Sequence, residues 1–303
     1  MISGLGRRRS VTHPRYVRAL IAAVVAVASA APRASAHSFI WKATSPDHHV
    51  VYLVGSVHLL TKDFYPLSPA LDAAFKDSDL LVEEADMGQM LGPSAQLELL
   101  TRGMLTDGRT LDQVISPAAY DLVTKRSTAL GLPMAAVDRF KPWMAALTLL
   151  GLEWQKAGFD PTLGLDKHFY DLAATAKMPV QGLETVDYQL ARFDGMTAEQ
   201  QEKMLTDTLK ELDTEKGNVA VLADAWKAGD APTVERLVVS DLKQDPAMYQ
   251  RLLVERNRNW FPKLQALFAR AGHAFVVVGA AHLVGPDGLL AMLQAKGYTI
   301  EQL

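Results

Sequence analysis

The amino-acid sequence predicts an α/β fold with a central sheet built from both ends of the chain and a large helical insertion between them. Short, continuous apolar runs at residues 50–54 and 274–278 are typical of strands buried on both faces. The spacing of apolar residues is helical from about 92 to 176 and again from 197 to 270. We therefore expect residues 37–303 to form a single α/β domain with a helical middle region.

Six strands are predicted, clustered near the two ends of this domain. Each is a short run of apolar or β-branched residues bounded by turn residues. The runs cover residues 38–43, 50–54, 79–84, 178–183, 275–279 and 298–303. The first two surround a polar turn, Asp47-His48-His49, and are expected to form a hairpin. The third ends in Glu83 and Glu84, and period-two alternation predicts that at most one of these faces a neighbouring functional group.

Helices are predicted over residues 68–76 and 286–295 in addition to the two long helical regions. Ser68 is a suitable N-cap for the first helix because Pro69 follows it at the first helical position. Proline and glycine interrupt the long regions because neither continues a helix well. The expected interruptions lie at Pro117, Pro133, Pro142, Pro161, Gly217, Gly229 and Pro246.

Residues 1–36 have the pattern of a cleaved secretory signal peptide. Several arginines precede a short apolar stretch from 19 to 28, and Ala34-Ser35-Ala36 forms a small-x-small cleavage site. The stretch is shorter than the roughly 20 residues that span a membrane. We therefore expect cleavage before His37, no stable membrane anchor afterwards, and a periplasmic or secreted protein.

Charge and cysteine content exclude several classes of function. Residues 1–36 hold six arginines and no acidic residue, so their removal leaves 25 basic and 34 acidic residues and changes the formal net charge from -3 to -9. An acidic chain does not favour binding to nucleic acid. There is no cysteine, which excludes disulfides, cysteine nucleophiles and thiolate metal sites.

The same short phrase follows two of the predicted strands. Gly55-Ser56-Val57-His58 follows the early run and Gly279-Ala280-Ala281-His282 follows the late one. Ligands of open α/β sheets bind beyond the carboxyl ends of the strands. Because imidazole serves both as a ligand for transition metals and as a general base, His58 and His282 are predicted to meet at one site.

Several further segments, in the same order, give the chain a resemblance to the TraB/GumN family, which includes the Tiki proteins. They extend over most of residues 37–303: Phe39-Ile40-Trp41-Lys42, the two Gly-x-x-His phrases, Leu81-Val82-Glu83-Glu84-Ala85-Asp86, Lys141-Pro142-Trp143-Met144, Gly164-Leu165-Asp166, Gly182-Leu183-Glu184-Thr185 and Glu255-Arg256-Asn257. The resemblance implies an α/β fold shared with erythromycin esterases and haem-binding ChaN-like proteins. For the Tiki branch it implies a divalent-metal-dependent peptidase that uses both histidines and a glutamate.

On this hypothesis, His58, His282 and Glu84 form a metal site. The histidines are the imidazole ligands, and Glu84 is either a third ligand or the base that deprotonates a coordinated water. A metal lowers the pKa of such a water from about 15.7 towards about 7. Oxygen and imidazole ligands suit manganese, zinc or cobalt. The expected substrate is a peptide or another small molecule.

Arg256 and Asn257 are further candidates for catalytic residues. Arg256 is predicted to hold a carboxylate or stabilise an oxyanion, because its guanidinium is planar and always charged. A structural ion pair is the alternative role for Arg256. Its carboxylate partner must come from another element, since the residues three and four positions away on the helix are uncharged. Asn257 is predicted to orient a water or the substrate. Glu184 and Asp166 are interpreted as residues at helix starts, and Met87 and Met90 as core residues.

Two alternatives to the metal-dependent hydrolase remain. In the first, the same cleft binds haem or a peptide without turnover. In the second, a metal-free, esterase-like hydrolase uses His58 and Glu84 as general bases. A Soret band with haem, or hydrolysis that resists a chelator, distinguishes these alternatives from the metal-dependent enzyme.

Overall fold

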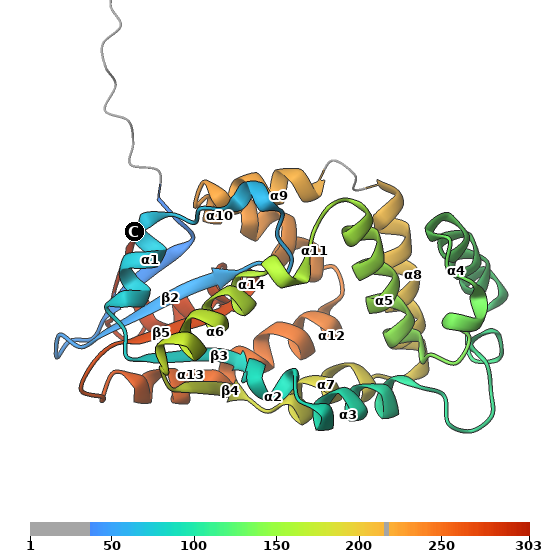
Figure 1. Ribbon diagram of the computed structural model, residues 1–303, viewed down its shortest axis with the longest axis horizontal. Coiled ribbons are helices and arrows are strands. Elements are labelled where there is room, and N and C mark those ends of the chain that lie inside the picture. Colours follow the sequence, from blue (N-terminus) through green and yellow to red (C-terminus); the bar gives the residue numbers. More distant parts are fainter. Residues whose placement is uncertain (1–36, 215–217) are drawn as a thin grey trace, which may run out of the picture. The chain divides into compact units, whose positions relative to one another are not determined.

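A six-stranded mixed sheet is the centre of the part of the chain that the computed structural model describes, residues 37–214 and 218–303 (Figure 1). The strand order is β4-β3-β5-β2-β1-β6. The strands are β1 (Ile40–Thr44), β2 (Val50–Ser56), β3 (Leu80–Ala85), β4 (Val180–Glu184), β5 (Ala274–Gly279) and β6 (Thr299–Gln302). The predicted signal peptide and the helix break predicted at Gly217 lie outside the described residues.

The pairing of the strands confirms that both ends of the chain build one sheet. β1 and β2 form the predicted antiparallel hairpin, and β6 pairs antiparallel with β1. The late strand β5 lies between β3 and β2 and is parallel to both, while β4 is parallel to β3. The carboxyl ends of β4, β3, β5 and β2 therefore lie at the same edge of the sheet.

Helices fill the chain between β3 and β5, interrupted by β4, as the spacing predicted. The helices in chain order are α1 (Pro69–Lys76), α2 (Met87–Met90), α3 (Pro93–Gly103), α4 (Pro117–Leu130), α5 (Pro142–Lys156), α6 (Leu165–Ala176), α7 (Val186–Asp194), α8 (Ala198–Thr214), α9 (Asn218–Lys227), α10 (Ala231–Val234), α11 (Ser240–Leu242), α12 (Pro246–Tyr249), α13 (Glu255–Leu267), α14 (Ala280–Leu283) and α15 (Leu289–Gln294). The π-helical turns η5 (Glu235–Val239) and η6 (Gln250–Val254) join α10 to α11 and α12 to α13.

The predicted helix starts are confirmed at the level of single residues. Ser68 caps α1, since its hydroxyl accepts a hydrogen bond from the Leu71 amide. Pro117 and Pro142 occupy the first turns of α4 and α5. Proline fits there because the first amides of a helix have no carbonyl partner within it.

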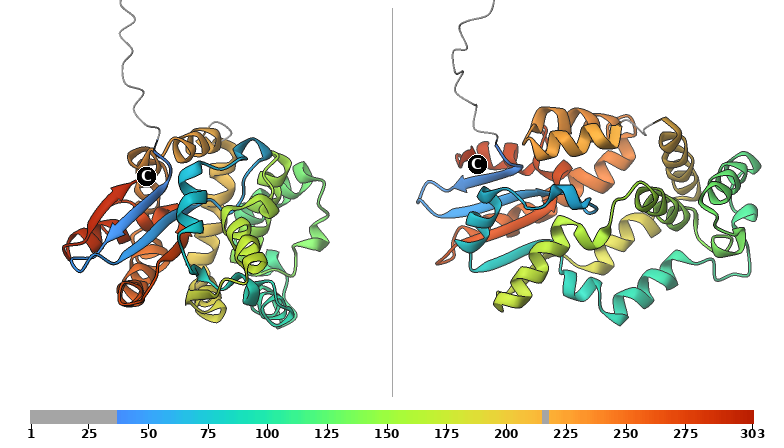
Figure 2. Two further views of the ribbon diagram at one scale, coloured as in Figure 1. Left: turned by 60° about the vertical axis from the view of Figure 1, so that its left-hand side comes forward. Right: turned by 45° about the horizontal axis from the view of Figure 1, so that its top comes forward.

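Two hydrophobic clusters stabilise the described residues. The larger surrounds the sheet, where Phe75 of α1 and Phe169 of α6 both pack against Phe275 of β5. In the view of Figure 1, α6 lies in front of the strands and α13 behind them, and Figure 2 shows the same elements from two further sides. The smaller cluster is formed mainly by α4, α5 and α8, which pack together in the predicted helical region.

The structure adds three helices outside the predicted helical ranges: α2, α7 and α14. α7 follows β4 directly, and Thr185 caps it by accepting a hydrogen bond from the Tyr188 amide. α14 begins directly after Gly279, so His282 lies in a helical turn instead of a loop. None was recognised, because α2 and α14 are single turns and α7 buries none of its residues fully. In the described part of the chain, no helix has the length and apolar character needed to cross a membrane.

Candidate functional site

The carboxyl edge of the parallel strands gathers the residues that the sequence singled out. β2 ends at Ser56, two residues before His58, and β3 ends with Glu83, Glu84 and Ala85. β4 ends at Glu184, and β5 ends at Gly279, three residues before His282. The parallel pairing brings these four strand ends together from positions up to about 220 residues apart in the sequence.

His58 is held by a carboxylate from α6. Its Nδ1 lies 2.9 Å from Oδ2 of Asp166, which also accepts a hydrogen bond from the Ser56 hydroxyl. The negative charge of Asp166 raises the pKa of His58 to about 9. The imidazole is 62% exposed, so water screens part of this attraction. The Nε2 atom of His58 is left facing the site.

Gly164 explains why α6 can deliver Asp166 to this place. A Cβ atom on Gly164 would lie 2.1 Å from the backbone oxygen of His58, well inside van der Waals contact. The absence of a side chain therefore lets the start of α6 approach the loop that carries His58. The segment Gly164-Leu165-Asp166 thus supports the histidine, whereas the sequence had suggested only a helix start.

Glu84 is a buried carboxylate surrounded by donors. Its Oε1 accepts from the backbone amide of Gly279 at 2.6 Å, and its Oε2 accepts from Nη2 of Arg256 at 2.5 Å and from Nε2 of Gln189 at 3.2 Å. Burial alone would raise the pKa of Glu84, but Arg256 and the two histidines outweigh it and hold the pKa well below its usual range. Glu84 is therefore ionised at neutral pH.

His282 is buried and neutral, and the identity of its neighbours fixes its tautomer. Nη1 of Arg256 lies 3.0 Å from Nε2 of His282, and because arginine only donates, Nε2 must be the unprotonated nitrogen. Nδ1 therefore carries the proton and donates to Oδ1 of Asn257 at 2.7 Å. Burial lowers the pKa of His282 to about 3, which agrees with a neutral ring.

Asn257 orients His282 and has no exposed side-chain surface. Its Nδ2 donates to the backbone oxygens of His282 and Asp287, at 3.2 and 2.8 Å. These bonds fix which side of the amide faces the imidazole. The residue is fully buried, so in this arrangement it contacts His282 where the sequence had predicted contact with water or substrate.

Arg256 joins two carboxylates from different strands. Its partners are tertiary, as expected: Glu84 of β3 and Glu184 of β4, with Nη2 2.5 and 2.7 Å from their oxygens. Nε also donates to Glu184, and Nη1 donates to the backbone oxygen of Leu252 as well as to His282. All five N–H donors of the guanidinium are therefore used. Glu184, interpreted from the sequence as a residue at a helix start, is a buried member of this cluster.

The three predicted metal ligands meet above Gly279. A Cβ atom at this glycine would lie 3.1 Å from Oε1 of Glu84, 3.6 Å from Cδ2 of His282 and 3.8 Å from Nε2 of His58. Nε2 of His282 and Oε1 of Glu84 are 3.9 Å apart. The missing side chain of Gly279 thus leaves a small space that all three side chains face.

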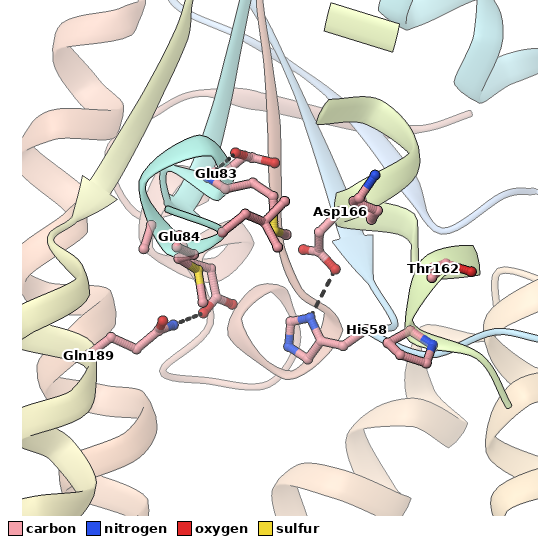
Figure 3. A pocket seen from close by; sticks show the side chains of 12 residues that line it. His58, Glu83, Glu84, Thr162, Asp166 and Gln189 are labelled. Carbon is pink, nitrogen blue, oxygen red and sulfur yellow. Dashed lines mark hydrogen bonds and ion pairs between the residues drawn. The ribbon is translucent and has the colours of Figure 1, made fainter. Parts of the chain in front are cut away.

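A pocket of about 460 Å³ lies beside this space; His58 and Glu84 line it, whereas Gly279 and His282 do not. Figure 3 shows His58, Glu84, Asp166 and Gln189 around it, with the His58–Asp166 and Gln189–Glu84 contacts marked. Its lining also includes Glu83, whose buried position raises its pKa to about 8. Glu83 accepts a hydrogen bond from the Met87 amide at 2.9 Å, whereas Glu84 contacts Arg256 and Gly279, so the two neighbouring carboxylates have different partners.

The side-chain types suit a divalent metal, but their spacing and one hydrogen bond count against it. Metal-bound histidines usually donate their second ring nitrogen to a carboxylate or carbonyl, and both histidines do so here, through Asp166 and Asn257. Two ligands about 2.1 Å from one ion lie at most about 4.2 Å apart, a limit that the 3.9 Å between His282 and Glu84 satisfies. However, no three His, Asp or Glu side chains in residues 37–214 and 218–303 stand at metal-ligating spacing. In addition, the lone pair on Nε2 of His282 already accepts a hydrogen bond from Arg256.

The fold and site together define an α/β protein with a histidine and carboxylate centre at the carboxyl edge of its sheet. The family model of the TraB/PrgY/gumN family matches residues 39–302, and the chain therefore belongs to this family. It is 27% identical over 262 residues to the uncharacterized protein YbaP of Escherichia coli (strain K12), covering 84% of this chain and 93% of that protein. YbaP of Shigella flexneri gives the same identity and coverage. No solved structure matches.

Proposed function

We propose that this protein is a metal-dependent hydrolase that cleaves peptide bonds, with His58, Glu84 and His282 as metal ligands. The observation that carries the proposal is the space above Gly279, towards which these three side chains converge. A bound divalent ion supplies a Lewis acid and lowers the pKa of water to near neutrality. Membership in the TraB/PrgY/gumN family supports the site without naming a substrate.

The surrounding residues orient these ligands. Asp166 holds the His58 ring so that Nε2 faces the site, and Asn257 holds the His282 ring in the matching tautomer. Arg256 keeps Glu84 ionised and in place. Since all donors of Arg256 are used and it is buried, we assign it a positioning role in place of the predicted contact with an oxyanion.

Gln189 is the better candidate for a group that binds a substrate oxygen. It lines the pocket, and its amide nitrogen already lies 3.2 Å from Glu84. An amide carries two N–H donors, so one remains to donate to a carbonyl oxygen beside Glu84. The sequence did not single out this residue, since it lies on the unpredicted helix α7.

The Arg256–His282 hydrogen bond favours a second candidate, a hydrolase that works without metal. In that arrangement Nε2 of His282 keeps accepting the hydrogen bond from Arg256, and His58, held by Asp166, acts as the general base once it loses its proton near pH 9. An adjacent carboxylate is the usual partner of a catalytic histidine. The two candidates differ in whether the hydrogen bond between Arg256 and His282 must break for activity.

Hydrolysis of blocked peptides and of a p-nitrophenyl ester, followed by mass spectrometry and absorbance, tests the proposal. The wild-type chain would be compared with His58→Ala, Glu84→Gln and His282→Ala, each loaded with manganese, zinc or cobalt or treated with a chelator. His273→Ala is the matched control, since His273 is a half-exposed histidine that bonds Asp77. We expect turnover that requires metal and all three ligands; activity retained by His58→Ala or His282→Ala would contradict the proposal, and chelator-resistant turnover would favour the metal-free candidate.

A further inference from the structure

One wall of the pocket is apolar and belongs to a single short segment. Met87 and Met90 of α2 and Leu91 directly after it line the pocket, opposite the side formed by His58 and Asp166. Leu91 is 52% exposed, and both methionines are half-buried. Their interpretation from the sequence as core residues is therefore wrong, because these side chains face an open cavity.

The polar groups at the rim of the pocket already have partners of their own. Nζ of Lys167 lies 2.5 Å from Asp171, one turn further along α6. The hydroxyl of Thr162 donates to Asp160 at 2.7 Å. Asp166 is used by His58 and Ser56. Of these groups, Asp166 is the one whose contacts are buried, whereas the Lys167–Asp171 pair is exposed.

The apolar wall is continuous with the site because α2 begins three residues after Glu84. Asp86 caps α2 by accepting a hydrogen bond from the Gln89 amide, which fixes the direction of the helix. A ligand atom placed next to Glu84 therefore has its neighbouring group beside Met87 and Met90. Methionine is unbranched and adapts to different apolar shapes, and the volume of about 460 Å³ lies in the range of small-molecule sites.

We propose that the substrate is a peptide that places an uncharged, apolar side chain beside the bond to be cleaved, bound by Met87, Met90 and Leu91. This inference rests on the proposed hydrolytic function for the choice of a peptide. Burying an apolar side chain against this wall is favourable. A glutamate side chain would lose hydration against this wall, and the carboxylates of Glu84 and Asp166, which line the same pocket, would repel it, so glutamate at this position is disfavoured.

Methyl resonances of ¹³C-labelled methionine test the inference directly on the full chain. The probes are acetyl-Gly-Leu-Gly-amide, acetyl-Gly-Ser-Gly-amide and acetyl-Gly-Glu-Gly-amide, titrated into the metal-loaded protein. Met87 and Met90 would be assigned by their Met→Leu variants, with the buried Met248 as an internal reference. We expect the leucine peptide to shift the signals of Met87 and Met90 saturably, with at least tenfold higher affinity than the other two peptides.

Two variants test whether binding of the leucine peptide depends on the apolar wall itself. Met87→Ser/Met90→Ser is expected to weaken binding of the leucine peptide at least fivefold. Leu97→Ser, at a 67% exposed leucine of α3 that does not line the pocket, is expected to leave it unchanged. Equal affinity for the three peptides, or no saturable shift of Met87 and Met90, would overturn the inference.

Mass spectra of the same samples distinguish failure of the inference from failure of the proposed function. Preference for leucine without cleavage under any metal would support the apolar wall and contradict the hydrolase. Cleavage of all three peptides at equal rates would support the hydrolase and contradict the apolar wall.

Discussion

Nη1 of Arg256 donates a hydrogen bond to Nε2 of His282 across 3.0 Å, in a part of the protein where both side chains are buried. The same guanidinium binds Glu84 and Glu184. The guanidinium of Arg256 therefore connects Glu84, Glu184 and His282. A metal ion that binds Nε2 of His282 must displace the hydrogen bond from Arg256. Metal binding at His282 therefore competes with a contact that stabilises this buried cluster.

Replacing Arg256 by alanine is expected to lower the free energy of unfolding by about 3–5 kcal/mol, because the buried carboxylates of Glu84 and Glu184 lose their counter-charge. Urea denaturation measures this loss. Arg102→Ala is the control, since Arg102 forms more exposed ion pairs with Glu98 and Asp187 and should cost less than about 1 kcal/mol. Similar losses in the two variants would contradict the proposed importance of the buried cluster.

Replacing Asp166 by asparagine is expected to return the pKa of His58 from about 9 towards its ordinary value of about 6.5. Because folding raises the pKa of His58, the protonated imidazole stabilises the folded state. This contribution is fully present below about pH 6.5 and is lost as the pH rises through about 9. In the metal-free chain, the stability of the wild type should therefore fall more steeply between pH 6.5 and 9 than that of Asp166→Asn. Imidazole NMR titration and denaturation at several pH values measure both effects, with the exposed Asp171→Asn on the same helix as control; an unchanged His58 pKa would refute this assignment.

Replacing Asn257 by alanine is expected to weaken metal binding by about 10–100-fold, because the His282 ring loses the group that fixes its tautomer and orientation. Competition with a chromogenic chelator measures the affinity. Asn259→Ala lies two residues further along α13, where the side chain is exposed and bonds Tyr188, and it should bind metal like the wild type. Equal affinities for the two variants would remove the positioning role from Asn257.

Replacing Gly279 by alanine is expected to abolish metal binding while the chain stays folded. The backbone φ of Gly279 is -50°, which alanine adopts readily, but the new methyl would occupy the space between Glu84, His282 and His58. Isothermal titration and circular dichroism measure the two properties. Gly151→Ala in α5, where a Cβ meets nothing within 4 Å, should leave metal binding intact and add up to about 1 kcal/mol of stability. A metal affinity of Gly279→Ala that matches the wild type would place the metal elsewhere.

The sequence predicted the strands, and the side chains that lie beyond their carboxyl ends, because the local sequence pattern agrees with the tertiary structure at these places. Apolar runs that end in Gly-x-x-His or in Glu83-Glu84 identify both the buried strands and their carboxyl ends. Parallel pairing then brings His58, Glu84 and His282 together without further information. The α/β fold class and the helical insertion were predicted from the spacing of apolar residues along the same sequence.

The residues that the sequence misjudged are those whose role depends on tertiary contacts. Asp166 and Glu184 each stand at or next to a helix start, and only packing reveals that they bind His58 and Arg256. Gln189 was missed because α7 was not predicted. Met87 and Met90 have core-like side chains, and only the fold of α2 over the strand end exposes them to the pocket.

The most direct test of the metal site is elemental analysis of the purified chain beside a His58→Ala/His282→Ala double variant. Both would be reconstituted with manganese, zinc or cobalt and then desalted. We expect close to one metal ion per wild-type chain and none in the double variant. Equal metal content in the two proteins, or no metal in either, would contradict a shared site at His58, Glu84 and His282.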